Sequence, residues 1–152
     1  MKPKSYRKKA TRQPALHKRR KALARQAMEL VNQLRLELPL ALAVTVIDMA
    51  SGVSLAAYSA TPALDWSTAA RFQVGLVQRK HEALAALGLA NEQMQDILIT
   101  LSSQLHLLRL TSTGEQLIAL VVDAQTTNLA LARNILRTLA EQLETAPALR
   151  AA

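Results

Sequence analysis

Residues 115–144 read EQLIALVVDAQTTNLALARNILRTLAEQLE. The apolar run that ends at Asp123 predicts a strand, and Asp123 lies near the start of the following helix, where a carboxylate interacts favourably with the helix dipole. The helix is amphipathic, and Ala146 and Pro147 end it. Its apolar residues are spaced three and four positions apart: Leu129, Ala132, Leu136, Leu139 and Leu143. No group able to carry out bond chemistry stands where strand meets helix, so the segment predicts a structural surface.

Two further strands precede this segment. MQDILITLSS (94–103) and QLHLLRLTS (104–112) are joined by a polar link near Ser102 and Ser103, and a turn at residues 111–114 leads into the last strand. Consecutive strands joined by short turns run antiparallel. MQDILITL (94–101) is predicted to be an edge strand, and an apolar edge invites pairing with a second copy.

A hairpin and a helix are predicted in the first half of the chain. LALAVTVID (40–48) is apolar on both faces, which suits a strand covered on both sides. A turn at residues 48–52 returns the chain as the strand VSLAAYSA (53–60). The following helix spans roughly residues 66–87, with Asp65 or Ser67 as its N-cap and Gly88 as its stop. One face of this helix is apolar with polar interruptions. The residues that follow one another on this face from turn to turn are Ala69, Phe72 or Gln73, Leu76, Lys80, Leu84 and Leu87.

An earlier helix is predicted after Pro14, because residues 15–38 contain neither Gly nor Pro. Its apolar residues follow helical spacing: Leu23, Ala27, Leu30, Leu34 and Leu38. The order is therefore helix, two strands, helix, three strands, helix. This order predicts an α+β fold with a single five-stranded antiparallel sheet and helices on its faces.

Positive charge is concentrated at the N-terminus. The chain carries 19 Lys and Arg against 11 Asp and Glu, a net charge of +8. Residues 1–25 hold 11 of the basic residues and no acid, which leaves residues 26–152 with 8 basic and 11 acidic residues. We interpret residues 1–25 as a basic arm, partly disordered or forming the start of the first helix. Its basic residues are Lys2, Lys4, Arg7, Lys8, Lys9, Arg12, Lys18, Arg19, Arg20, Lys21 and Arg25.

Two interpretations of the arm stay open. It binds polyanions, either nucleic acid phosphates or anionic lipid headgroups, or it is a solubilising tail or a solvated helix face. Tyr6 is the one aromatic residue of the arm, so base stacking has little support. No Trp or Phe is present there to anchor a helix at a membrane surface.

Composition sets outer limits. The length of 152 residues predicts one domain, here residues 26–146 with a frayed C-terminus at 147–152. Few residues are aromatic, so the core is built from aliphatic side chains. The absence of Cys excludes disulfides and thiolate ligands and fits the cytoplasm. No apolar run approaches the ~20 residues of a membrane-spanning helix, and no apolar segment follows the charged N-terminus as in a signal peptide.

The chain resembles the roadblock family, which includes dynein light chains and bacterial gliding-motility regulators. The hairpin AVTVIDMASGVSLAAYS, the helix followed by three strands, and the closing strand and helix carry the resemblance over residues 27–145. Residues 127–133, TNLALAR, resemble the N-L-G-L-x-R helix start of the family, with Ala130 where Gly is common. Longin- and profilin-like folds have a similar order of elements.

The resemblance implies a homodimer or heterodimer in which the third strands pair and the second helices pack. It also implies docking to small Ras-like GTPases or cytoskeletal motors. Trp66 and Phe72 lie early in the second helix on different faces, so we expect one in the core and the other at the interface. The predicted dimer interface comprises Trp66, Phe72, Met94, Ile97, Ile99 and Leu101.

Candidate catalytic groups are few. His17, His81 and His106 have no ligand spacing on one element, so no metal site is predicted. Asp48 and Asp123 end strands, but a turn role and a dipole role explain them. No phosphate-binding glycine motif or G-x-S-x-G elbow occurs. We expect no enzyme activity and no cofactor.

Two functions from different classes follow. The leading hypothesis is a non-enzymatic dimeric interaction module that scaffolds or regulates a small Ras-like GTPase or another regulatory protein. The alternative is a nucleic-acid-binding protein that uses paired basic N-terminal arms on a roadblock-like dimerisation platform.

Overall fold

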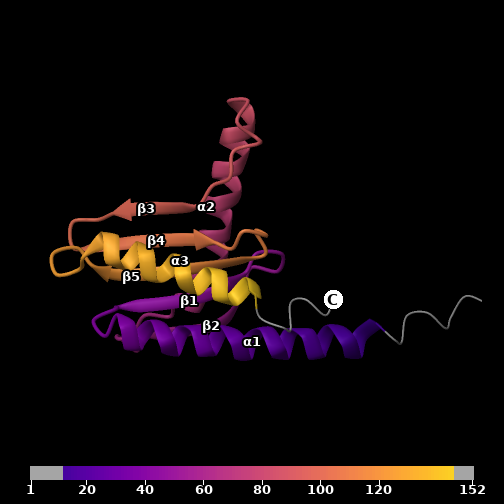
Figure 1. Ribbon diagram of the computed structural model, residues 1–152, viewed down its shortest axis with the longest axis horizontal. Coiled ribbons are helices and arrows are strands. Elements are labelled where there is room, and N and C mark those ends of the chain that lie inside the picture. The colour runs from indigo at the N-terminus through magenta and orange to yellow at the C-terminus, as the bar shows by residue number, and fades with distance from the viewer. Residues whose placement is uncertain (1–11, 146–152) are drawn as a thin grey trace, which may run out of the picture.

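A computed structural model describes residues 12–145 and contains one five-stranded antiparallel sheet with three helices (Figure 1). The elements are α1 (Arg12–Glu37), β1 (Ala43–Asp48), β2 (Val53–Ser59), α2 (Trp66–Ala86), β3 (Asp96–Thr100), β4 (Gln104–Leu110), β5 (Gln116–Asp123) and α3 (Leu129–Thr145). The strands lie in the order β2-β1-β5-β4-β3. Both the order of elements and the sheet confirm the prediction.

The last strand of the chain, β5, lies at the centre of the sheet. It pairs with β1 on one side and with β4 on the other, and every residue from Gln116 to Val122 is buried. β1 is buried along Ala43–Ile47 as well, as expected for a strand covered on both faces. These two apolar strands therefore form the middle layer of the domain.

Asp123 forms a turn rather than the start of α3. Its Oδ1 accepts hydrogen bonds from the backbone N–H groups of Gln125 and Thr126 and from the Thr126 hydroxyl. The backbone donors at Thr126 and Gln125 lower the pKa of this carboxyl. Asn128 caps the helix instead, because its Oδ1 accepts the N–H of Leu131 at 3.0 Å. The predicted dipole role of Asp123 was wrong, since the turn separates it from the helix by five residues.

Helices α1 and α3 share one face of the sheet. The residues of α3 that the spacing predicted are buried there (Ala132, Leu136, Leu139 and Leu143), together with Leu23, Ala27, Leu30 and Leu34 of α1. Pro14 lies in the first turn of α1, where a missing N–H costs no hydrogen bond. The boundary placed between residues 25 and 26 falls inside this helix.

Helix α2 packs on the opposite face. Ala70, Val74 and Val77 are its buried residues, and they form a second core cluster with Ile47, Leu108, Leu117 and Ala119. As predicted, Asp65 is the N-cap and accepts the Ser67 N–H at 3.0 Å. Figure 1 shows α2 at a steep angle to the strands, with its C-terminal part extending past β3. Only its first half therefore covers the sheet.

The strand ends differ from the sequence-based expectation. β1 begins at Ala43, and Leu40 is 73% exposed because the chain turns between α1 and β1. β3 covers only Asp96–Thr100, so Met94 and Leu101 flank it. Among the helices described, none is long and apolar enough to cross a membrane.

Candidate interaction surface

β3 is an open edge of the sheet. It ends the strand order, and its main packing partner is β4, whereas α1 and α2 both pack against the other edge strand, β2. Leu101 donates its N–H to the Gln104 carbonyl at 2.8 Å. The antiparallel alternation then turns the peptide groups of Asp96, Leu98 and Thr100 outward, away from β4. β3 contains no Pro, Gly or Lys that would block the pairing of a further strand.

A carboxylate fixes β3 to its neighbours. Asp96 lies 2.9 Å from the Arg133 guanidinium of α3 and 3.8 Å from that of Arg109 on β4. The Asp96 and Arg109 side chains are 21% and 16% exposed, so this cluster is better shielded from water than a surface ion pair. The open edge is thus held in a defined position against the core.

The outward side of α2 is apolar. Phe72 is 79% exposed, Leu76 41% and Leu87 70%. The helix face predicted from the sequence within residues 69–87 differs from the face that is buried. The buried residues Ala70, Val74 and Val77 lie roughly 100° around the helix axis from it. The sequence therefore identified an apolar face, but the sheet is covered by another one. Exposed apolar patches of this kind mark interaction sites.

A hollow joins this helix face to the edge strand. Its volume is about 400 Å³, and it opens between α2 and the segment that leads into β3. Its lining residues are Leu76, Lys80, Leu84, Glu92, Gln93, Met94, Asp96 and Ile97. The predicted interface residues Met94 and Ile97 therefore share one surface with α2.

The other predicted interface residues occupy distinct positions. Trp66 is partly buried, and its ring lies edge to face with His106 at 5.8 Å between centroids. Ile99 is the cross-strand partner of His106. Burial lowers the pKa of His106. Phe72 points to solvent away from this group, and Leu101 is 45% exposed beyond the end of β3.

The basic arm is only partly described. Lys2, Lys4, Arg7, Lys8 and Lys9 lie outside the described residues, and Arg12 is the first residue of α1. Of the arm residues on α1, Lys18, Arg20, Lys21 and Arg25 have exposed side chains.

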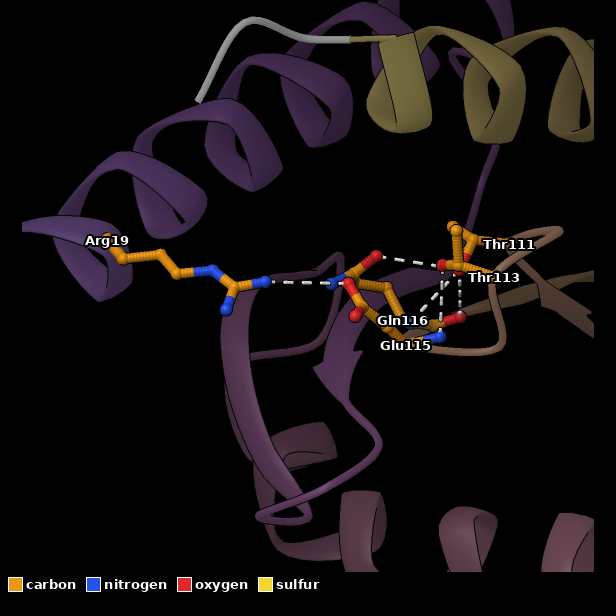
Figure 2. A network of polar contacts seen from close by, with 5 residues as sticks. All are labelled: Arg19, Thr111, Thr113, Glu115 and Gln116. Carbon is orange, nitrogen blue, oxygen red and sulfur yellow. Dashed lines mark hydrogen bonds and ion pairs between the residues drawn. The ribbon is translucent and has the colours of Figure 1, made fainter. Parts of the chain in front are cut away.

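Arg19 differs from these residues, because it reaches Glu115 at 3.7 Å across the gap between α1 and the β4–β5 turn (Figure 2). The same turn holds a polar network that is buried at Thr111 and Gln116 and exposed at Thr113 and Glu115. Thr111 Oγ1 accepts the Gln116 N–H at 3.1 Å, and the Glu115 N–H reaches Thr113 Oγ1 at 3.3 Å. The first half of α1 is thereby connected to a structured turn.

The candidate catalytic carboxylates are engaged in local structure. Asp48 accepts hydrogen bonds from the N–H and the hydroxyl of Ser51 in the β1–β2 turn, as the sequence predicted. Asp123 is occupied by its own turn. No group of three metal-ligating side chains occurs within residues 12–145.

Sequence reasoning missed two contacts between distant segments of the chain. The Asp96–Arg133 contact joins residues 37 positions apart, and the Arg19–Glu115 contact joins the first helix to the last hairpin. No local pattern encodes either contact. The helical spacing of Leu76, Lys80 and Leu84 puts them on one helix face, and this spacing is the signal in the sequence for the hollow.

Comparison of the sequence with known proteins finds no matching family model and no matching curated protein. Solved structures do match the fold. MglB of Myxococcus xanthus superposes with a TM-score of 0.70 at 14% identity, over 79% of this chain and 86% of that one. The gliding protein MglB of Thermus thermophilus gives 0.68 at 22% identity, over 86% and 93%. A Roadblock/LC7 domain from Streptomyces avermitilis gives 0.66 at 14% identity, over 77% and 93%.

Proposed function

Since the chain has a roadblock-family fold, we propose that it is a non-enzymatic interaction module that forms a homodimer through β3 and α2. The dimer presents a surface for a regulatory protein partner, a small Ras-like GTPase in the leading case, in the cytoplasm. The single observation that carries the proposal is the continuity of the open β3 edge with the apolar outward face of α2.

The β3 edge supports self-association. Its outward peptide groups at Leu98 and Thr100 match an antiparallel strand of the same sequence, so two copies related by a twofold axis would form one continuous ten-stranded sheet. Ile97 and Ile99 project to the α2 side and are only partly buried in one copy. Pairing of the edges would bury them further.

Helix α2 supplies the apolar area that strand pairing alone lacks. A short edge strand contributes few hydrogen bonds, and a stable dimer buries about 1,200–2,000 Å² in total. Phe72, Leu76 and Leu87 extend the apolar surface along α2, and the hollow beside Met94 and Ile97 can receive side chains of the partner's helix. Aromatic residues such as Phe72 are favoured as energetic centres of interfaces.

The partner class rests on the resemblance. The resemblance to the roadblock family implies docking to a small Ras-like GTPase, as a regulator or a scaffold. Two of the matching structures are MglB proteins, one a gliding protein, and a further MglB structure with a TM-score of 0.66 shows a tetrameric arrangement. A regulatory role through protein contacts also fits the carboxylates Asp48 and Asp123, which are committed to turns.

The mass of the protein in solution tests the proposal. Light scattering at micromolar concentration should give twice 16.6 kDa for the intact chain. Ile99→Lys and Phe72→Glu should each shift the mass toward the monomer, because each places a charge in the apolar interface. Leu36→Lys is the matched control, since Leu36 is 81% exposed on α1, and it should leave the mass unchanged.

Either a strict monomer or an unchanged mass in both interface variants would contradict the dimer. The partner assignment is tested separately, by capture of purified small GTPases in their GDP and GTP forms. If a dimer forms but no GTPase binds in its GDP or GTP form, the proposed dimer is retained and the proposed partner class is rejected.

A further inference from the structure

We propose that the N-terminal half of α1 binds the phosphate backbone of duplex nucleic acid through a cationic ridge made of Lys18, Lys21 and Arg25. The spacing i, i+3, i+7 puts these residues within an arc of roughly 60° and along about 10 Å of the helix axis. All three are exposed, while Leu23 and Ala27 are buried on the opposite side of the helix. The ridge therefore faces solvent directly.

The three ridge residues have no acidic partner in the part of the chain that the structure describes. Within residues 12–145, no ion pair engages a ridge residue, and the nearest acid that follows in the sequence is Glu29. Most arginines of the body, by contrast, have acidic partners: Arg79 with Glu82, Arg109 and Arg133 with Asp96, and Arg137 with Glu141. Unpaired cations in a row attract counterions that a polyanion would displace, which favours binding.

The ridge is held rigidly. Leu23 is buried between the ridge positions, and Arg19 contacts Glu115 on the β4–β5 turn (Figure 2). In Figure 1, the N-terminal part of α1 projects past the ends of the strands. A fixed, projecting helix loses little conformational entropy when its side chains contact phosphates.

The structure favours nucleic acid over a lipid surface. A helix that lies in a membrane interface needs a free apolar face. In α1 that face is already used, because Leu23, Ala27, Leu30 and Leu34 are buried in the core of the domain. The helix contains no Phe, Tyr or Trp on which single-stranded bases would stack, which favours phosphate contacts to a duplex. Such contacts carry no sequence information, so binding should be independent of sequence.

The ridge and the proposed dimer surface are separate. α1 packs on β2, and β2 and β3 are the two opposite edges of the sheet. Pairing at β3 would leave the ridge free and would give each dimer two ridges. Nucleic acid binding is therefore an additional activity, and it does not require the GTPase partner.

Fluorescence anisotropy of the intact chain with a labelled 20-base-pair DNA duplex tests the ridge, over 50–200 mM salt. The variant Lys18→Gln/Lys21→Gln/Arg25→Gln should bind about tenfold more weakly at 50 mM salt. The slope of log Kobs against log salt should become shallower by about 0.9 per lost phosphate contact, up to about 2.7 per protomer.

A control variant that loses the same number of positive charges distinguishes binding by the ridge from attraction to the overall charge of the protein. Arg71→Gln/Arg79→Gln/Arg137→Gln also removes three exposed cations, but from α2 and α3. It should keep the affinity and slope of the intact chain within a factor of about two. Equal weakening by both triple variants, or no duplex binding by the intact chain at 50 mM salt, would overturn the proposal.

Two further experiments distinguish the ridge from the preceding basic residues and from a lipid-binding surface. Deleting residues 1–14 removes the basic residues before the ridge, and the remaining binding should still depend on Lys18, Lys21 and Arg25. If the deletion abolished duplex binding and the ridge variant had no effect on it, the proposed role of the ridge would be overturned. Flotation with vesicles of phosphatidylserine and phosphatidylcholine should show no ridge-dependent binding; vesicle binding without duplex binding would reject nucleic acid in favour of lipid.

Discussion

Trp66 and His106 pack edge to face, with their ring centroids 5.8 Å apart and their planes inclined at 71°. Trp66 is the first residue of α2, and His106 lies on β4 opposite Ile99 of the open edge. The contact therefore ties the start of the projecting helix to the strand beside the proposed interface. Trp66 is the one tryptophan in the sequence, so its fluorescence reports on this contact.

Protonation of His106 should weaken the domain. Burial lowers the pKa of His106 below its ordinary value of 6.5, so the folded state prefers the neutral ring. The unfolded chain then binds the proton first, and the stability that His106 contributes above pH 6.5 is lost as pH falls below that value through the lowered pKa of the folded state. Thermal unfolding followed by Trp66 fluorescence at pH 7.5 and 5.5 should show a lower Tm at pH 5.5.

His106→Gln is the control for this titration. Gln keeps a polar group beside Gln104, which contacts His106 at 3.0 Å, but it does not titrate. His17 and His81 remain in both proteins. The variant should lose less Tm between the two pH values; an equal loss would show that His106 is not responsible.

Removal of the charge at Asp96 should loosen the edge strand. Asp96→Asn weakens the contacts to Arg133 and Arg109, and we expect a loss of about 1 kcal/mol in the free energy of unfolding by urea. Glu82→Gln is the matched control, because its pair with Arg79 is largely exposed and should contribute little. A similar effect of both substitutions would contradict a special role for the Asp96 cluster.

The buried hydroxyl of Thr111 should matter for stability. Thr111 is 3% exposed, and its Oγ1 accepts the buried Gln116 N–H at 3.1 Å. Thr111→Val leaves that donor unpaired and should cost about 1–3 kcal/mol in urea unfolding. Thr113→Val at the exposed side of the same network should change stability by no more than about 0.5 kcal/mol. The reverse order of the two effects would be inconsistent with the network of Figure 2.

The cap of α2 should respond to acid. Hydrogen bonds from the Ser67 and Thr68 hydroxyls lower the pKa of Asp65 to about 2 from 3.8. Its contribution to stability is thus present above pH 3.8 and is lost as pH falls toward 2. Asp65→Ala should lower the Tm at pH 6 and have a smaller effect at pH 2.5. An effect of equal size at both pH values would exclude the charged cap as its source.

The fold could be predicted because local patterns coincide with elements. The spacing of Leu136, Leu139 and Leu143 predicted an amphipathic closing helix, and the apolar run that ends at Asp123 predicted the strand β5. Short turns between strands left few topologies open. The roadblock resemblance, stated from the hairpin and the TNLALAR helix start, is confirmed for the fold.

The helix face of α2 was harder to predict, because the helix is apolar on two sides. Small residues, Ala70 and Val74, allow close packing on the sheet, whereas Phe72 and Leu76 are larger and stay outside. Periodicity alone favoured the larger residues. The surface contacts of Asp96 and Arg19 depend on the final packing of distant segments, and no spacing in the sequence encodes them.

Amide hydrogen exchange along β3, measured by NMR, tests the proposed dimer most directly. The N–H groups of Leu98 and Thr100 point away from β4, so in a monomer they exchange freely with water. Edge pairing with a second copy predicts slow exchange of these two amides at 100 μM protein and fast exchange in Ile99→Lys. Fast exchange of both amides in the intact protein at that concentration would contradict strand pairing at β3.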